Sequence, residues 1–409
     1  MKNLQVFLKK LLVIVIIFSL HSCTTVKNQK DDNSISKEFA DEIFQKSIKH
    51  LQNNFVTVKQ MGQLPRSIDR GFRPIKDWTS GFYPGNLWLV YEYTKDKSLL
   101  EMAKFSTELL DEEKYNTTDH DIGFRIYCSY GRGYELTNSQ AYKNVIIQAA
   151  ESAIQRYNPI VKSIMSWEPQ PKRDWQYPVI IDNMMNLELL FAATKFTGDT
   201  KFYNIAIQHA NTAMKYQYRK DFSCSHVIDF DSITGDFRKR DWNNGNSDPS
   251  TASWSRGQSW GLYGFTMMYR ETKDEMYLIQ AENIAKYILE NPNMTKDMVP
   301  YWDYNAPEIP TLRDASAAAI MASGFIELST LSKKNSQKYF DVGEKILNSL
   351  ASPNYFAEPE TNNNFLLKHA TGNFLKDSEK DGTLIYADYY FLEGLTRYLK
   401  LKENNTNIY

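Results

Sequence analysis

A helical pattern recurs along the chain after residue 36. In each copy, a polar residue is followed three and four positions later by large apolar residues and seven positions later by Ala or Gly. Apolar residues at this spacing share one face of a helix, and the leading polar residue suits the N-cap position. The copies begin at Asp96, Asp199, Asp274 and Ser336, and a looser copy runs from Asn138 through Tyr142 to Ala149.

Each copy follows another helical stretch, such as residues 85–94, 183–196, 258–272 or 314–331. The repeating unit is therefore a helical hairpin, and repeats that cover most of a chain favour one closed or stacked architecture over several domains. Strand patterns are confined to pieces such as Ser225–Phe230 and Gly235–Arg240, which predict a short β-hairpin in a long inter-helix loop. We predict an all-α toroid of helical hairpins, with residues 37–409 as a single domain.

The first residues have the features of an export signal. Lys2, Lys9 and Lys10 precede the apolar run Leu11–Leu20, which is too short to span a bilayer. The next residues, His21-Ser22-Cys23, complete a bacterial lipobox in which the cysteine becomes the acylated first residue; an ordinary signal with a chance cysteine is the alternative. We predict a signal peptide over residues 1–22, lipidation at Cys23 and a flexible polar tether over residues 23–36. The protein is then anchored in the outer membrane, facing the periplasm or the medium.

Charge and composition exclude several classes of function. The 48 Lys and Arg are balanced by 49 Asp and Glu, so no basic excess exists to neutralise nucleic acid. The histidines lack metal-site spacing, and phosphate-loop, nucleophile-elbow and dinucleotide motifs are missing, so we expect no metal and no cofactor. Buried thiols at Cys128 and Cys224 are favoured over a disulfide between them. The oligomeric state cannot be read from the sequence.

Candidate chemistry lies in aromatic, charged and Gly-rich segments between the hairpins. Tryptophan beside Asp, His and Arg suits a carbohydrate cleft, although Trp also packs between helices. Asp121 and Asp182 are embedded among apolar residues, where an unpaired carboxylate is costly. Burial raises the pKa of a carboxyl group, and a second carboxylate nearby raises one of the two further, as a general acid requires. The alternative role for either aspartate is helix capping.

The segments in order resemble the unsaturated glucuronyl hydrolases, glycoside hydrolase family 88. They are DWTSGFYPGNLWLVYEYT (77–94), HDIGF (120–124), IIDNMMNLELL (180–190), SWSRGQSWGLYGF (253–265), YWDYNAPEIPTLRDASAAAI (301–320) and ADYYFLEGL (387–395). The resemblance implies an (α/α)6 barrel, with Asp182 as general acid and base and Asp121 in support. It also implies sugar contacts at Trp78, His120, His226, Trp254, Arg256 and Trp260. Asn244 is added to them because it stands where the family has Gln, and Asp248–Ser253 is about two residues longer than in the family.

The chemistry implied by the resemblance is hydration of a double bond. Polysaccharide lyases leave a 4,5-unsaturated uronic acid at the non-reducing end of their oligosaccharide products, and this family removes it. We expect a sulfated rhamnose aglycone, as in ulvan, with chondroitin and hyaluronan disaccharides as alternatives. Two other hypotheses stay open. One is an unsaturated rhamnogalacturonyl hydrolase of family 105; the other is a helical lipoprotein that binds glycans without cleaving them, which does not need acids in apolar segments.

The lipobox leads to a prediction that cell fractionation checks. Cys23→Ala removes the side chain that is acylated, so we expect the variant to be soluble or misprocessed while the wild type partitions with membranes. Recovery of the wild type wholly in the soluble fraction contradicts the anchor. Proteolysis of intact cells then distinguishes a periplasmic protein, which is protected, from one exposed to the medium.

Overall fold

The computed structural model describes residues 34–404 and residue 408. The predicted signal peptide, Cys23 and most of the predicted tether lie outside these residues. Ile35 and Ser36 already belong to the folded unit that begins at Ile35. The Ile35 side chain is buried and its N–H donates to the Tyr398 hydroxyl at 3.2 Å, while the Ser36 hydroxyl caps the first described helix. The folded unit therefore begins two residues before the predicted domain boundary at residue 37.

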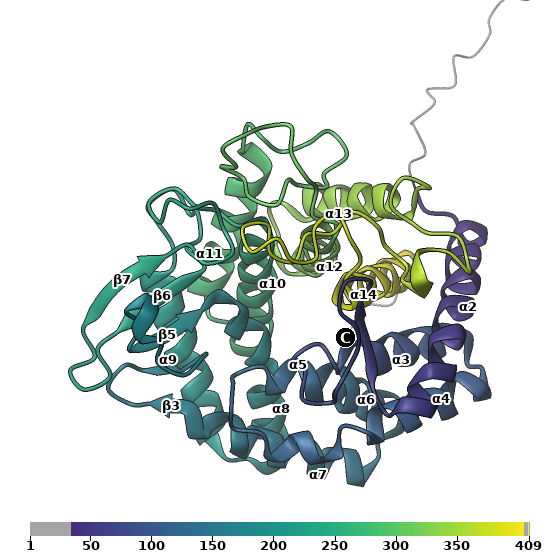
Figure 1. Ribbon diagram of the computed structural model, residues 1–409, viewed down its shortest axis with the longest axis horizontal. Coiled ribbons are helices and arrows are strands. Elements are labelled where there is room, and N and C mark those ends of the chain that lie inside the picture. The colour runs from purple at the N-terminus through teal and green to yellow at the C-terminus, as the bar shows by residue number, and fades with distance from the viewer. Residues whose placement is uncertain (1–33, 405–407, 409) are drawn as a thin grey trace, which may run out of the picture. The chain divides into compact units, whose positions relative to one another are not determined.

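An outer ring of amphipathic helices surrounds the barrel (Figure 1). Asp96, Asp199 and Asp274 cap their helices as predicted, each accepting a hydrogen bond from the N–H two residues later. Two predicted caps are wrong by one residue: Ser139 takes the place of Asn138, and Asn335 precedes Ser336, which is the first helical residue. The outer helices are α2 (Lys37–Met61), α4 (Lys97–Glu108), α7 (Gln140–Ala153), α9 (Thr200–Tyr216), α11 (Glu275–Glu290) and α13 (Ser336–Ala351).

The inner helices are buried on nearly every side, because each has outer helices on one side and the barrel interior on the other. In α12, every residue from Ala315 to Ser329 is buried. Neighbouring inner helices contact one another, and the last helix returns to the first, so the ring closes. The inner helices are α3 (Phe82–Thr94), α5 (Ile122–Ile126) continued through a π-helical turn (Tyr127–Gly131) into α6 (Arg132–Thr137), α8 (Glu188–Thr197), α10 (Ser255–Thr272), α12 (Ala315–Leu331) and α14 (Ile385–Lys402). This arrangement is an (α/α)6 barrel, and it confirms the predicted fold.

Small residues permit the close approach of elements, as the sequence pattern predicts. A Cβ atom on Gly343 of α13 would lie 2.6 Å from the Ile326 side chain of α12. The approach is tighter at Gly81, directly before α3, where a Cβ atom would lie 2.1 Å from the backbone oxygen of Phe124. Backbone cannot yield as a side chain can, so Gly81 is required for the first two inner elements to meet.

The predicted hairpin is present and forms part of a larger sheet. Strands β6 (Val227–Phe230) and β7 (Phe237–Asp241) pair antiparallel, and β5 (Tyr177–Ile180) adds to the other edge of β6. The sequence pattern missed β5, which contains Pro178; proline is tolerated there because β5 is an edge strand. Two further strand pairs are short: β1 (Leu64–Ser67) with β2 (Gly71–Arg73), and β3 (Tyr157–Asn158) with β4 (Ser163–Ile164).

Buried ion pairs occupy the barrel beneath the C-terminal halves of the inner helices. Arg397 of α14 and Arg270 of α10 contact the two oxygens of Glu327 at 3.0 and 3.1 Å, and Arg132 of α6 pairs with Glu393. Because each charge meets an opposite charge, the desolvation cost of burying it is offset. These pairs fill that end of the barrel, so open space for chemistry lies at the other end.

Two smaller observations complete the fold. Cys128 and Cys224 are buried free thiols, as favoured from the sequence. Within residues 34–404, none of the helices combines the length and the apolar character needed to cross a bilayer.

Candidate active site

A cavity lies where the inner helices begin. Trp78 precedes α3, Asp121 is the residue before α5, Trp254 is the residue before α10, and Tyr386 is the second residue of α14. Asp182 belongs to a 3₁₀ turn that leads into α8. All five line one cavity of about 1080 Å³, part of it open to solvent. Side chains far apart in sequence therefore converge because the N-terminal ends of the inner helices face the same way.

The surroundings of this cavity favour a negatively charged ligand. Helices carry a partial positive charge at their N-termini, and α10, α12 and α14 all begin at this end. Arg66, Arg70, Arg256 and Lys376 are among the lining residues. Arg66 is paired with Asp77 and Glu379, and Arg256 with Asp314, so Arg70 and Lys376 are the lining cations best placed to meet an anionic ligand.

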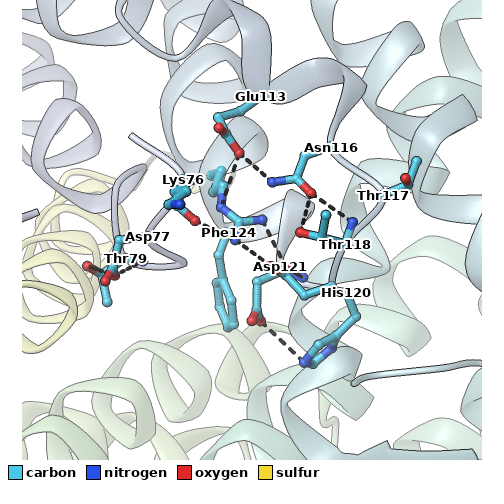
Figure 2. A network of polar contacts seen from close by, with 12 residues as sticks. Lys76, Asp77, Thr79, Glu113, Asn116, Thr117, Thr118, His120, Asp121 and Phe124 are labelled. Carbon is cyan, nitrogen blue, oxygen red and sulfur yellow. Dashed lines mark hydrogen bonds and ion pairs between the residues drawn. The ribbon is translucent and has the colours of Figure 1, made fainter. Parts of the chain in front are cut away.

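Asp121 occupies the N-cap position of α5 but does not cap it. Its side chain makes no capping hydrogen bond, and Oδ1 lies 3.4 Å from Nε2 of His120 (Figure 2). Burial, together with the negative charges of Asp119 and Asp182, raises the pKa of Asp121 well above its usual value, against the opposing charge of Arg125. The capping alternative is excluded for this residue, and Asp121 is suited to hold a proton at neutral pH.

A network of hydrogen bonds and ion pairs holds the backbone behind Asp121 (Figure 2). Asp119 Oδ1 accepts from the Asp121 N–H and from Arg125 Nη1, both at 2.9 Å. Arg125 Nη2 donates to Asp119 Oδ2 at 2.7 Å and to the backbone oxygen of Lys76 at 2.9 Å, while Nε lies 3.6 Å from Glu113. The network joins the segment that carries Asp121 to the loop that carries Trp78.

Asp182 is positioned by β5 and the following turn. The N–H of Ile181 donates to the backbone oxygen of His226, which extends the pairing of β5 with β6 and places the two side chains together. His226 Nε2 lies 3.3 Å from Asp182 Oδ1, and neither atom makes a hydrogen bond within the described residues. The Asp182 side chain is 13% exposed and makes no helix-capping bond. Asp182 and Asp121 thus each face a histidine.

Two predicted sugar contacts do not lie on the cavity wall. His120 is buried behind Asp121, and burial lowers its pKa to about 4 against the opposing charges of Asp119 and Asp182. His120 is therefore neutral near pH 7 and contacts Asp121 instead of the cavity. Trp260 is completely buried, packed against Phe124 and Tyr390, because the first turns of α10 point toward the barrel core.

The other predicted contacts line the cavity, namely Trp78, His226, Asn244, Trp254 and Arg256. Arg256 also has a structural role. Its guanidinium donates to Asp314 Oδ2 and to the backbone oxygens of Thr371 and Gly372, each at 2.6 Å. These bonds hold the loop of residues 371–379, which we call the cleft loop, against the start of α10.

The sequence analysis missed several lining residues. None belongs to a motif with a mechanism of its own, and most lie on loops. Trp167 stands beside Glu168 in a segment that matches none of the recognised ones, and Tyr386 directly precedes the recognised segment 387–395. The missed residues are Arg66, Arg70, Trp167, Asn373, Lys376, Ser378, Glu379 and Tyr386. Among the residues that the structure describes, no group of three or more His, Cys, Asp or Glu is placed to hold a metal ion.

Comparison with known proteins agrees with this geometry. The model of glycosyl hydrolase family 88 matches residues 47–271. An unsaturated glucuronyl hydrolase of Formosa agariphila is 44% identical over 95% of this chain and 98% of its own. The crystal structure of an unsaturated glucuronyl hydrolase specific for heparin is 40% identical, with a TM-score of 0.85 over 90% of this chain and 99% of the other.

A second solved structure carries a ligand. It is a mutant unsaturated glucuronyl hydrolase of Streptococcus agalactiae complexed with dGlcA-GalNAc6S, 27% identical, with a TM-score of 0.73 over 89% of this chain and 92% of the other. The family match covers more than half of the chain, and the relative from Formosa agariphila covers nearly all of it. The chain belongs to glycoside hydrolase family 88 and is an unsaturated glucuronyl hydrolase.

Proposed function

We propose that this enzyme removes the 4,5-unsaturated uronic acid from lyase-made oligosaccharides by hydrating the C4=C5 double bond. The observation that carries the proposal is the pair of aspartates on one cavity, each beside a histidine, with the pKa of Asp121 raised. The raised pKa of Asp121 lets this carboxyl group hold a proton near neutral pH, and Asp182 is the second carboxyl group on the same cavity. A retained proton and a carboxylate are the two groups that acid-catalysed hydration needs.

The reaction proceeds in three steps. Asp182 gives its proton to C4, and the positive charge that develops is shared by C5 and the ring oxygen. The Asp182 carboxylate then takes a proton from water as the water oxygen bonds to C5. The resulting hemiketal opens, and the aglycone leaves from C1. Asp121 supplies the second carboxyl group, and its raised pKa lets it hold a proton beside Asp182 at neutral pH.

The uronate carboxylate and a sulfated aglycone account for the cations around the cavity. Arg70 and Lys376 both line it, and Arg70 donates to the Ser378 hydroxyl at 2.7 Å. Arg173 lies against the rings of Trp175 and Trp242, and its charge, together with partial burial, lowers the pKa of Lys376. Two cations held near one another favour an anionic group between them.

The aglycone that we favour is the sulfated rhamnose of ulvan. A specific observation supports a competing choice, because two solved neighbours act on or bind sugars of another class, heparin and dGlcA-GalNAc6S. Sulfated hexosamine is therefore the second candidate. The lipid anchor inferred for Cys23 places the enzyme at the outer membrane, where oligosaccharides from external polysaccharide enter the cell.

The position of water addition tests the proposed reaction. With a lyase-made substrate in deuterated water, we expect one deuterium at C4 and loss of ultraviolet absorbance in step with turnover. In heavy-oxygen water, trapped early by reduction, the label should appear at C5. Asp182→Asn keeps the shape but removes the proton, so its rate should fall by about 10²-fold or more. Label only at C1, or cleavage of a saturated glucuronide at a comparable rate, contradicts hydration.

The network behind Asp121 makes a prediction about pH. Asp119→Asn removes a negative charge that raises the pKa of Asp121 and leaves Arg125 to lower it further. The proton is then lost at lower pH, so the alkaline limb of the kcat/KM profile should move to lower pH. Asp111→Asn is the matched control, since Asp111 is exposed and pairs only with Lys114 in this region. An unchanged alkaline limb in Asp119→Asn means that the ionisation of Asp121 does not limit the reaction.

Sulfate recognition can be tested at the cavity mouth. Lys376→Ala removes a cation without touching either aspartate, so KM for a sulfated substrate should rise about tenfold, as expected for a lost charge-assisted hydrogen bond, with kcat nearly constant. The unsulfated substrate should be unaffected, and Lys368→Ala, outside the cavity, is the control. Comparison of sulfated rhamnose with sulfated hexosamine aglycones identifies the natural class. Equal effects of Lys376→Ala on sulfated and unsulfated substrates contradict a sulfate contact.

A further inference from the structure

The backbone at Asn244 determines which nitrogen of His226 carries a proton. The Asn244 N–H donates to His226 Nδ1 at 3.3 Å. A backbone N–H can only donate, so Nδ1 is the accepting nitrogen and the proton of the neutral ring lies on Nε2. Nε2 is the atom that faces Asp182 Oδ1 at 3.3 Å. His226 is thereby held as a donor toward the carboxylate that the proposed function makes the general acid.

The loop that carries Asn244 is held by hydrogen bonds to the buried carboxylate of Asp303. Asp303 is fully buried, and its carboxylate accepts from the Asn246 N–H at 2.8 Å and from the Ser253 N–H at 3.0 Å. Gly245 packs so closely that a Cβ atom there would lie 2.9 Å from Asp303 Oδ2. Asn244 therefore has little freedom on this side, and its remaining polar contact lies across the cavity.

That contact is with the cleft loop. Asn373 Oδ1 accepts from the Lys376 N–H at 3.1 Å, which assigns the oxygen and nitrogen of this amide, since a backbone N–H needs an acceptor. Asn373 Nδ2 consequently donates to Asn244 Oδ1. Both asparagines line the cavity, so the bond connects two of its walls. A continuous chain of contacts runs from the Lys376 backbone through Asn373, Asn244 and His226 to Asp182.

We propose that Asn373 and Asn244 are positioning residues that couple the cleft loop to Asp182 by fixing the tautomer and orientation of His226. The inference rests on the proposed function in that Asp182 is the general acid. Asn244 is a position at which this chain departs from the family pattern. Its short side chain bonds Asn373, while its backbone N–H donates to His226. A sugar that contacts the cleft loop therefore contacts the segment that, through Asn244 and His226, orients the groups beside Asp182.

Asp182 also interacts with titratable and charged side chains that do not belong to this chain of contacts. The titratable or charged side chains that interact with Asp182 include Asp121, His120, Arg256 and Cys224. None of them is bonded to Asn373. The side-chain route from Asn373 to Asp182 therefore runs through Asn244 and His226, while Arg256 bonds the backbone of the same loop at Thr371 and Gly372.

The decisive variant is Asn373→Ser. Serine can accept from the Lys376 N–H and keep the local turn, but it cannot reach Asn244. We expect kcat to fall roughly three- to tenfold, the size of one net hydrogen bond, with a smaller change in KM. Asp377→Asn, on the same loop and paired only with Lys380, is the control.

A double variant separates this coupling from a direct sugar contact. The His226→Gln variant lacks the imidazole ring through which Asn373 is proposed to act. Adding Asn373→Ser to this variant should therefore change kcat little further. Multiplied effects in the double variant, or a change confined to KM, overturn the proposal. Nitrogen-15 spectra of labelled histidine give a readout that needs no turnover: His226 should show the Nε2–H form in the wild type and a mixture in Asn373→Ser. An unchanged His226 tautomer in that variant also overturns it. If the wild type fails to hydrate unsaturated substrates, the proposed function fails while the spectra still decide the coupling.

Discussion

The cost of burying two carboxylates in one cavity is the constraint on which the rest of the site depends. Negative charges placed close together and away from water cannot both be ionised cheaply, so one of them retains a proton. In this barrel the pKa of Asp121 is raised, and Asp119 contributes to the rise while Arg125 limits it. The burial that makes it unfavourable to ionise both carboxyl groups also keeps a proton in the site, and the first step of enol-ether hydration needs that proton.

The barrel offsets this cost with groups contributed from many parts of the chain. Helix N-termini, guanidinium groups and two histidines surround the acids, and they come from several hairpins and loops of the barrel. Asp121 depends on the segment 119–125, whereas Asp182 depends on the edge strand β5 and on the loop around Asn244. The two acids therefore have separate supports, and a change to one support leaves the other in place.

Local patterns in the sequence predicted the helical hairpins and singled out the two acids, whereas the six-fold barrel and the roles of the acids were implied by the family resemblance. Helix faces repeat with fixed spacing, so Asp96, Asp199 and Asp274 could be assigned as caps, and a carboxylate within an apolar run, as at Asp182, is conspicuous in any sequence. Contacts between distant segments carry no such local signal. Nothing in the sequence around Asn373 indicates that its side chain bonds Asn244. Trp260 was predicted to contact sugar, but it is buried because the first turns of α10 point it toward the barrel core. The one-residue errors at Asn138 and Ser336 arise because two polar residues stand side by side and either could cap.

Closure of the ring by α14 has a consequence for biosynthesis. This helix is the last described element of the chain, yet it packs between α12 and α3 and contributes Tyr386 to the cavity. Until it emerges from the ribosome, the apolar sides of α3 and α12 that face α14 are uncovered, and the cavity lacks the wall that Tyr386 provides. Contacts between the first and last hairpins are also the most distant in sequence, and such contacts form slowly. A chain that ends before α14 therefore exposes apolar surface, which favours aggregation, and it lacks part of the catalytic cavity.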